Sequence, residues 1–129
     1  MAAKCIAIIN NESAIVRLLS DLLQAEGYTT TLWAGSTDAH AMVRDELPDL
    51  IILDISIDAP MSGLVVLDLL KLDPATTEIP VIACSTNLAL LREQEGRLRE
   101  LNCTIQPKPF AFAQILAAVV GVIGPGSEH

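Results

Sequence analysis

Polar residues stand at the ends of several apolar runs in this chain, where their side chains could meet at one site. Asp54 closes the run Leu-Ile-Ile-Leu, and Ser85 closes Val-Ile-Ala-Cys. Asn10 and Asn11 follow Cys-Ile-Ala-Ile-Ile, and Lys108 follows Cys-Thr-Ile-Gln-Pro. These positions supply a carboxylate that can act as a nucleophile, an ammonium group, a hydroxyl and two amides. A single polar residue after an apolar run is usually a turn former, but the combination favours a functional site.

The apolar runs alternate with segments of helical period, and this alternation predicts the elements that position those residues. Five strands are predicted at 5–9, 28–33, 50–53, 81–84 and 103–106. Helices are predicted between 10 and 27, from a cap at Ser36 to 47, and at 64–72, 88–101 and 112–123. This order predicts an α/β fold, a three-layer (βα)5 doubly wound parallel sheet. The carboxyl ends of its strands meet at one edge, where we expect the polar residues together.

The composition narrows the classes of function. The 129 residues are 51% hydrophobic but only 3% aromatic, and the formal net charge is -8. Because nucleic-acid binding relies on basic patches and aromatic stacking, we expect no direct contact with nucleic acid. We also expect no membrane segment, since the most apolar stretch, 115–123, is far shorter than the roughly 18 residues that span a bilayer. With no signal-peptide pattern near the N-terminus, the three cysteines are expected to be buried, reduced thiols of a cytoplasmic domain.

Several motifs, taken in order, resemble the receiver domain of bacterial two-component response regulators over about residues 4 to 123. They are Asp54 at the end of its apolar run, Pro60 and Gly63 in the following loop, Ile79-Pro-Val-Ile before Ser85, and Lys108-Pro109-Phe110. The last matches the family's Lys-Pro-Phe signature, with its usual cis-proline at Pro109. The resemblance implies the strand order 2-1-3-4-5, a receiver domain at 1–123 and a flexible tail at 124–129.

The resemblance also implies a role for each residue of the set. Asp54 would accept a phosphoryl group from a histidine kinase or phosphotransfer protein, Ser85 would hydrogen-bond the acyl phosphate, and Lys108 would pair with its oxygens. Mg²⁺ would be held by Asp54, the residues at positions 10 and 11 and the backbone carbonyl of Ser56. These residue types suit the roles, because phosphoryl transfer needs a nucleophile and neutralisation of the phosphoryl oxygens. We expect no enzyme activity beyond self-phosphorylation and dephosphorylation at Asp54.

The acidic pair that holds Mg²⁺ in the family is replaced here by Asn10 and Asn11. Mg²⁺ favours carboxylate ligands. The family's pocket sets three carboxylates against one lysine, whereas this pocket sets Asp54 against Lys108 and is neutral. We therefore expect Mg²⁺ binding to be weak or absent. We also expect a direct ion pair between Asp54 and Lys108, which would weaken the carboxylate as a nucleophile.

The switch region departs from the family pattern as well. The loop from Asp54 to Gly63 is about one residue longer than usual. The switch aromatic, three residues before the lysine, is replaced by Ile105, which has no ring to swing. With Ser85 as the other switch residue, this predicts a degraded switch.

The remaining polar candidates carry weaker signals. Glu12 and Asp58 are the only nearby carboxylates that could compensate for the lost charge, and Glu12 is expected in the first turn of its helix. Thr86 is interpreted as structural. His40 and His129 have no acidic or hydroxyl neighbours that suggest catalysis.

Two interpretations remain open: a working phosphoacceptor with a weakened metal site, or a pseudo-receiver that acts as a phosphorylation-independent protein–protein interaction module. A nucleotide- or flavin-binding domain is opposed by the lack of glycine in Ile-Asn-Asn-Glu-Ser after the first strand. A downstream protein partner is expected on the fourth helix, fifth strand and fifth helix, and a homodimer is left open. The leucines at 88, 91, 98 and 101 are interpreted as core contacts of the fourth helix.

Overall fold

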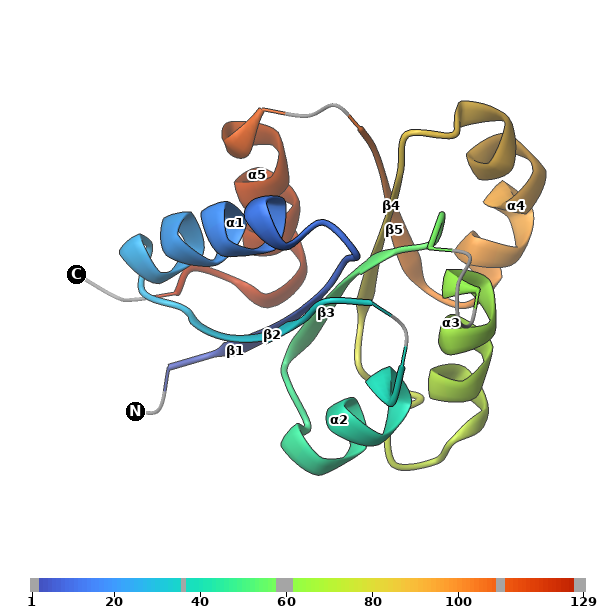
Figure 1. Cartoon of the computed structure of the whole chain (residues 1–129), viewed down its shortest axis with the longest axis horizontal. Helices are drawn as coiled ribbons and strands as arrows, with labels where there is room; N and C mark the ends of the chain where they lie inside the picture. The colour runs from blue at the N-terminus through green and yellow to red at the C-terminus, as the bar shows by residue number, and fades with distance from the viewer. Residues whose placement is uncertain (1–2, 36, 58–61, 109–110, 127–129) are drawn as a thin grey trace.

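The computed structural model describes residues 3–35, 37–57, 62–108 and 111–126 of the chain. Five parallel strands form one sheet in the order β2-β1-β3-β4-β5 (Figure 1). The strands are β1 Cys5–Ile9, β2 Thr29–Trp33, β3 Leu50–Asp54, β4 Val81–Ser85 and β5 Cys103–Pro107. The predicted fold class, the parallel sheet and its strand order are confirmed.

Helices cover both faces of this sheet (Figure 1). They are α1 Ser13–Ala25, α2 Ala39–Glu46, α3 Gly63–Leu72, α4 Leu88–Glu100 and α5 Phe112–Ile123. The core clusters place α1 and α5 on one face and α2, α3 and α4 on the other. Among the residues described, no helix combines the length and apolar character needed to cross a bilayer.

The three central strands, β1, β3 and β4, are mainly apolar on both sides because each face of the sheet is covered by helices. Every residue of β3 is buried, and its successive side chains point to opposite faces. Ile51 and Leu53 belong to the cluster under α2, α3 and α4, whereas Leu50 and Ile52 belong to the cluster under α1 and α5. Asp54, the last residue of β3, is therefore the point where an apolar strand delivers a carboxylate to the edge of the sheet.

Two helices begin later than the sequence predicted. α2 begins at Ala39, and Asp38 occupies its N-cap with φ of 57°, so the cap predicted at Ser36, which itself lies outside the described residues, is wrong. Aspartate tolerates this left-handed conformation better than most residues. Glu12 lies at the N-cap of α1 and not in its first turn, and its side chain makes no capping hydrogen bond.

The leucine stripe of α4 is largely a core contact, as interpreted from the sequence. Leu91 and Leu98 are buried, and Leu101 packs against the same cluster. Leu88 is the exception, because 52% of its surface is exposed.

The three cysteines are all free. Cys84 and Cys103 are buried, as expected from the sequence, whereas Cys5 is half-buried.

The chain continues past α5 against the start of β2. The Tyr28 hydroxyl donates a hydrogen bond of 2.6 Å to the carbonyl of Gly124. A Cβ on Gly126 would lie 2.6 Å from the carbonyl oxygen of Glu26, so this glycine permits a close backbone approach. Residues 124–126 are thus in contact with the domain. Residues 127–129, including His129, lie outside the described part, and for them the flexible tail stays a prediction.

His40 has a carboxylate neighbour, contrary to the expectation from the sequence. Its Nε2 lies 2.8 Å from Oδ2 of Asp73, and the Nε of Arg44 lies 3.5 Å from the same oxygen. The other oxygen of Asp73 accepts a 2.9 Å hydrogen bond from the N–H of Ala75. The Ala75 bond, followed by the His40 bond, lowers the pKa of Asp73. This contact forms only when α2 packs beside α3, so local sequence could not show it.

Replacing Asp73 with asparagine is expected to lower the melting temperature near neutral pH and to change it little in acid. The pKa of Asp73 in the folded chain lies below its ordinary value of 3.8. Its ionised form therefore stabilises the fold above the unfolded-state pKa, and that contribution is lost as the pH falls through the folded-state pKa. Melting curves of Asp73→Asn, wild type and the exposed control Asp21→Asn between about pH 2 and pH 7 measure this. An Asp73→Asn deficit that is equal at every pH would contradict it.

Candidate functional site

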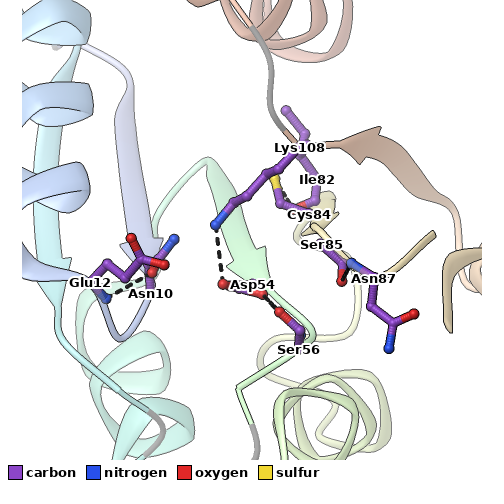
Figure 2. Close-up of polar contacts among 9 residues, drawn as sticks. All are labelled: Asn10, Glu12, Asp54, Ser56, Ile82, Cys84, Ser85, Asn87 and Lys108. Carbon is purple, nitrogen blue, oxygen red and sulfur yellow. Dashed lines mark hydrogen bonds and ion pairs between the residues drawn. The ribbon is translucent and has the colours of Figure 1, made fainter. Parts of the chain in front are cut away.

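Asp54 lies at the carboxyl edge of the sheet with only 6% of its surface exposed. Its Oδ1 accepts two hydrogen bonds from Ser56, one from the backbone N–H at 2.9 Å and one from the hydroxyl. Its Oδ2 lies 3.1 Å from the Nζ of Lys108 (Figure 2). Both oxygens are therefore engaged, and the orientation of the carboxylate is fixed.

Lys108 reaches Asp54 from the loop that follows β5. Its backbone N–H donates a 2.9 Å hydrogen bond to the carbonyl of Ser85, which ends β4. The side chains of Lys108 and Asp54 are 10% and 7% exposed, so their ion pair is buried. The direct pairing expected from the sequence is confirmed. The pair joins the loop after β5 to the end of β3. Breaking it would be costly, because removal of one partner leaves the other charge buried without compensation.

Ser85 is placed next to this pair by the parallel pairing of β3 and β4, but its hydroxyl takes part in a turn. The residue is fully buried, and its Oγ accepts a 2.9 Å hydrogen bond from the N–H of Asn87. Asn87 in turn caps α4 through a hydrogen bond from the N–H of Leu90. Thr86 is exposed. Because Ser85 accepts in this hydrogen bond, its O–H proton remains available to donate to a group on Asp54.

Asn10 and Asn11 occupy different environments. Asn10 follows β1 and is buried with 6% exposed, whereas Asn11 and Glu12 are exposed. The Oδ1 of Asn10 accepts a 2.9 Å hydrogen bond from the backbone N–H of Glu12. Asn10, Asp54 and Lys108 line the same small cavity of about 10 Å³, and Asn11 is not among its lining residues. Of the two asparagines predicted as metal ligands, the structure thus brings only Asn10 to the cavity at Asp54.

Gly63, at the start of α3, lies against the backbone of Asp54. A Cβ at this position would be 2.5 Å from the Asp54 carbonyl oxygen and 2.7 Å from the Cα of Ile55. The N–H of Gly63 also donates a 2.7 Å hydrogen bond to the carbonyl of Ile57. The intervening residues 58–61, with the predicted Asp58 and Pro60, lie outside the described part of the chain, as do Pro109 and Phe110. The closeness of the two backbones explains why the loop ends in glycine.

The Gly63→Ala substitution is expected to destabilise the fold by about 1–3 kcal/mol, because the added methyl group collides with backbone that has no room to move. Gly121→Ala is the matched control. Gly121 lies in α5 with no atom within 4 Å of an added Cβ, so this change should stabilise by up to about 1 kcal/mol through helix propensity. Urea unfolding measures both. Equal effects of the two substitutions would show that the close approach at Asp54 is wrong.

Ile105, predicted from the sequence as a switch position, lies in β5 beside α4. It is half-buried and packs against the core cluster under α4. It also lines a groove of about 380 Å³ between α4 and β5. The other lining residues are Leu88, Leu91, Arg92, Glu95, Arg99 and Pro107.

Sequence reasoning missed two neighbours of Asp54. Ser56 had been considered only for its backbone carbonyl, but its N–H and hydroxyl both bond the carboxylate. Its position two residues after an aspartate is typical of such a turn and could have indicated it. Cys84 also lines the cavity at Asp54, and burial raises the pKa of its thiol to about 12. The thiol is therefore an inert neighbour at neutral pH.

Comparisons place the chain among known proteins. Residues 6–120 match a family model described as the response regulator receiver domain. The polar-differentiation response regulator DivK of Brucella anthropi is 31% identical over 122 residues, which cover 94% of this chain and 97% of that protein. The structure of the chemotaxis response regulator CheY4 of Vibrio cholerae has a TM-score of 0.82 at 20% identity and covers 95% of this chain and 100% of its own. This likeness shows a common fold.

A second solved structure bears on metal binding. The receiver domain of the sensor histidine kinase PA1611 from Pseudomonas aeruginosa has a TM-score of 0.80 at 19% identity, covering 95% of this chain and 99% of its own. That structure is described with a magnesium ion coordinated in its active-site cleft.

The described residues around Asp54 offer few of the ligands that a magnesium ion prefers. Mg²⁺ takes oxygen ligands and favours carboxylates. In the described part of the chain no group of three or more His, Cys, Asp or Glu side chains could hold a metal. Asp54 is the one carboxylate among the residues lining the cavity, its oxygens are engaged by Ser56 and Lys108, and the Asn10 oxygen is engaged by Glu12. A buried ammonium group beside the carboxylate also repels a second cation.

Proposed function

Because this chain belongs to the response regulator receiver domain family, which acts in phosphorelay signalling, we propose that it accepts a phosphoryl group on Asp54. The supporting observation is the buried 3.1 Å contact between Asp54 Oδ2 and Lys108 Nζ. It places a carboxylate nucleophile beside the cation that can neutralise phosphoryl oxygens. The alternative of a phosphorylation-independent module is not favoured, since the likeness to a response regulator extends over nearly the whole chain.

In the proposed transfer, Asp54 Oδ2 attacks the phosphorus of a phosphohistidine on a histidine kinase or phosphotransfer protein. An O–P bond forms while the P–N bond breaks, and its electron pair stays on the imidazole nitrogen, which takes a proton from solvent. The two hydrogen bonds from Ser56 hold Oδ1 and so orient Oδ2. Lys108 is then beside the new phosphoryl group. Receiver domains are in general signalling modules and not enzymes, and we propose that hydrolysis of the acyl phosphate resets the chain.

Receiver domains bind Mg²⁺ at their active sites. We propose that Mg²⁺ binding by this chain is weak or absent. The support is the donor set described above, in which Asp54 is paired with Lys108 and the amide of Asn10 replaces a carboxylate. Binding through Asn11 or the Ser56 carbonyl stays a prediction without a described contact.

We propose Ser85 and Ile105 as the switch positions. The O–H of Ser85 would donate to a phosphorylated Asp54 while its Oγ accepts from the N–H of Asn87 at the start of α4. Since Asn87 caps α4, a shift of Ser85 toward the phosphoryl group would be passed to this helix. Ile105 beside α4 has no ring to exchange between two positions, so the response of β5 is expected to be small. The cis peptide at Pro109 stays a prediction.

Receiver domains interact with histidine kinases, phosphotransfer proteins and downstream effectors. We propose that the downstream partner of this chain binds the face made by α4, β5 and α5. The groove between α4 and β5 offers the exposed Leu88 with charged residues at its rim, and α5 carries no charged residue from Phe112 to Ile123. Alternatively, a second copy of this chain binds the same face and forms a homodimer.

We propose that the protein works in the cytoplasm. The free cysteines support a reducing compartment.

Phosphorylation with a small donor tests the proposal. Incubation with phosphoramidate is expected to add one phosphoryl group per chain, seen by intact-mass spectrometry and removed by hydroxylamine as an acyl phosphate should be. Amide NMR signals of Asn87 and Leu88 are expected to shift on labelling, and the signal of Ile105 in β5 is expected to shift less. A chain that takes up no label, or a label that resists hydroxylamine, would argue for the interaction-module alternative. Shifts confined to α1 would contradict the proposed face.

A further inference from the structure

The side-chain amide of Asn10 has only one orientation that satisfies its neighbours. The backbone N–H of Glu12 is a donor, so the atom that receives its 2.9 Å hydrogen bond must be the amide oxygen. The amide nitrogen consequently faces away from Glu12. Figure 2 shows this nitrogen on the side of Asn10 that faces Lys108 and Asp54. Within the described residues this nitrogen has no hydrogen-bond partner, and it keeps some contact with solvent although only 6% of the residue is exposed.

This orientation reverses the chemistry of the position. An aspartate in the same place would present a second oxygen to the cavity, which is what a metal ion needs. Asn10 instead has its N–H donors on the side toward Lys108 (Figure 2), and it lines the same cavity as Asp54 and Lys108. Lys108 contributes further N–H donors and a positive charge. Donors are what the oxygens of a phosphoryl group need.

We propose that the pocket holds the phosphoryl group on Asp54 without a divalent cation, with the Nδ2 of Asn10 and the Nζ of Lys108 as its hydrogen-bond donors. The inference rests on the proposed phosphorylation of Asp54. Asn10 takes the place of the metal by donating to phosphoryl oxygens directly. The amide is already oriented for this role, because its oxygen accepts the hydrogen bond from the N–H of Glu12 at the start of α1. Attack on phosphoramidate then forms the Asp54 O–P bond, breaks the P–N bond and releases ammonia, with the proton supplied by water.

The rate of labelling by phosphoramidate, with EDTA or with Mg²⁺, tests the inference. The wild-type chain is expected to label at rates within about twofold in the two conditions. Asn10→Asp keeps an acceptor for the Glu12 N–H, so the start of α1 is preserved, but it replaces the donors with negative charge. Its labelling in EDTA is expected to fall at least about tenfold, with recovery in Mg²⁺.

Asn102→Asp is the matched control, because it makes the same chemical change at an exposed position before β5, at the opposite edge of the sheet. It should label like the wild type. Labelling of the wild type that Mg²⁺ stimulates tenfold or more would overturn the inference and leave the proposed function intact. Equal labelling of Asn10→Asp and Asn102→Asp in EDTA would also overturn it. Failure of all variants to label in either condition would instead refute the proposed function.

A Mg²⁺ titration followed by amide NMR gives a readout that does not depend on labelling. In the wild type, the signals of Asn10, Asp54 and Lys108 are expected to stay unchanged up to about 10 mM Mg²⁺, a concentration that would fill even a weak protein site. In Asn10→Asp, shifts at the same residues are expected. Saturable shifts at Asp54 in the wild type would show a metal site and overturn the inference.

Discussion

The Asp54→Asn variant is expected to take up no phosphoryl group from phosphoramidate, a loss of at least about 100-fold in labelling rate. The substitution keeps an acceptor oxygen for Ser56 but removes the nucleophile, because an amide oxygen is far less reactive than a carboxylate. The neighbouring residues that line the cavity supply no second carboxylate. Intact-mass spectrometry over a time course measures the rate.

The control for this variant is Asp21→Asn, which makes the same change at an exposed position of α1. It should label like the wild type, and a melting curve should show that Asp54→Asn is folded. If the folded Asp54→Asn chain labels as fast as the control, the acceptor is another residue, and the assignment of the site to the end of β3 is wrong.

The Lys108→Met variant is expected to lose about 3–5 kcal/mol of stability, because it leaves the carboxylate of Asp54 buried without its counter-charge. The two side chains are 10% and 7% exposed, so solvent screens the remaining charge poorly. The hydrogen bonds from Ser56 to the other oxygen soften the loss but bring no positive charge. The midpoint of urea unfolding measures the change.

Two further variants distinguish the stability lost by breaking the buried ion pair from the stability lost by removing any positive charge. Arg99→Met breaks the exposed pair of Arg99 with Glu95, whose side chains are 71% and 51% exposed, and should change stability by at most about 1 kcal/mol. The double variant Asp54→Leu, Lys108→Met removes both charges and should recover most of the loss. A Lys108→Met effect as small as that of Arg99→Met would mean that the pair is not buried in solution.

Sequence reasoning recovered the fold because the central strands β1, β3 and β4 are mainly apolar and are buried on both faces. The run Leu50–Asp54 is a case in point, since four aliphatic residues and a single carboxylate place the strand in the core and its last residue at the edge. The same logic placed Lys108 at that edge and paired it with Asp54, as the structure bears out. In a parallel sheet the carboxyl ends of the strands lie at one edge, so residues that end or follow β3 and β5 lie at the same edge of the sheet.

The details of the site could not be predicted in the same way, because they depend on short turns and on packing between elements. The Ser85 hydroxyl accepts a hydrogen bond from the N–H of Asn87. This hydrogen bond depends on the conformation of the turn before α4, which the sequence does not reveal. The difference between buried Asn10 and exposed Asn11 depends on the point where the chain leaves β1. The contact of His40 in α2 with Asp73, the residue that follows α3, spans 33 positions of sequence.

The most direct test of Asp54 as the phosphoryl acceptor is to locate the label. The chain is labelled with phosphoramidate in EDTA, digested, and read by tandem mass spectrometry. We predict that the phosphoryl group is on Asp54 in every labelled peptide and that it forms without Mg²⁺. A label on Asp58, on another carboxylate or on a histidine would contradict the assignment of the acceptor to the end of β3.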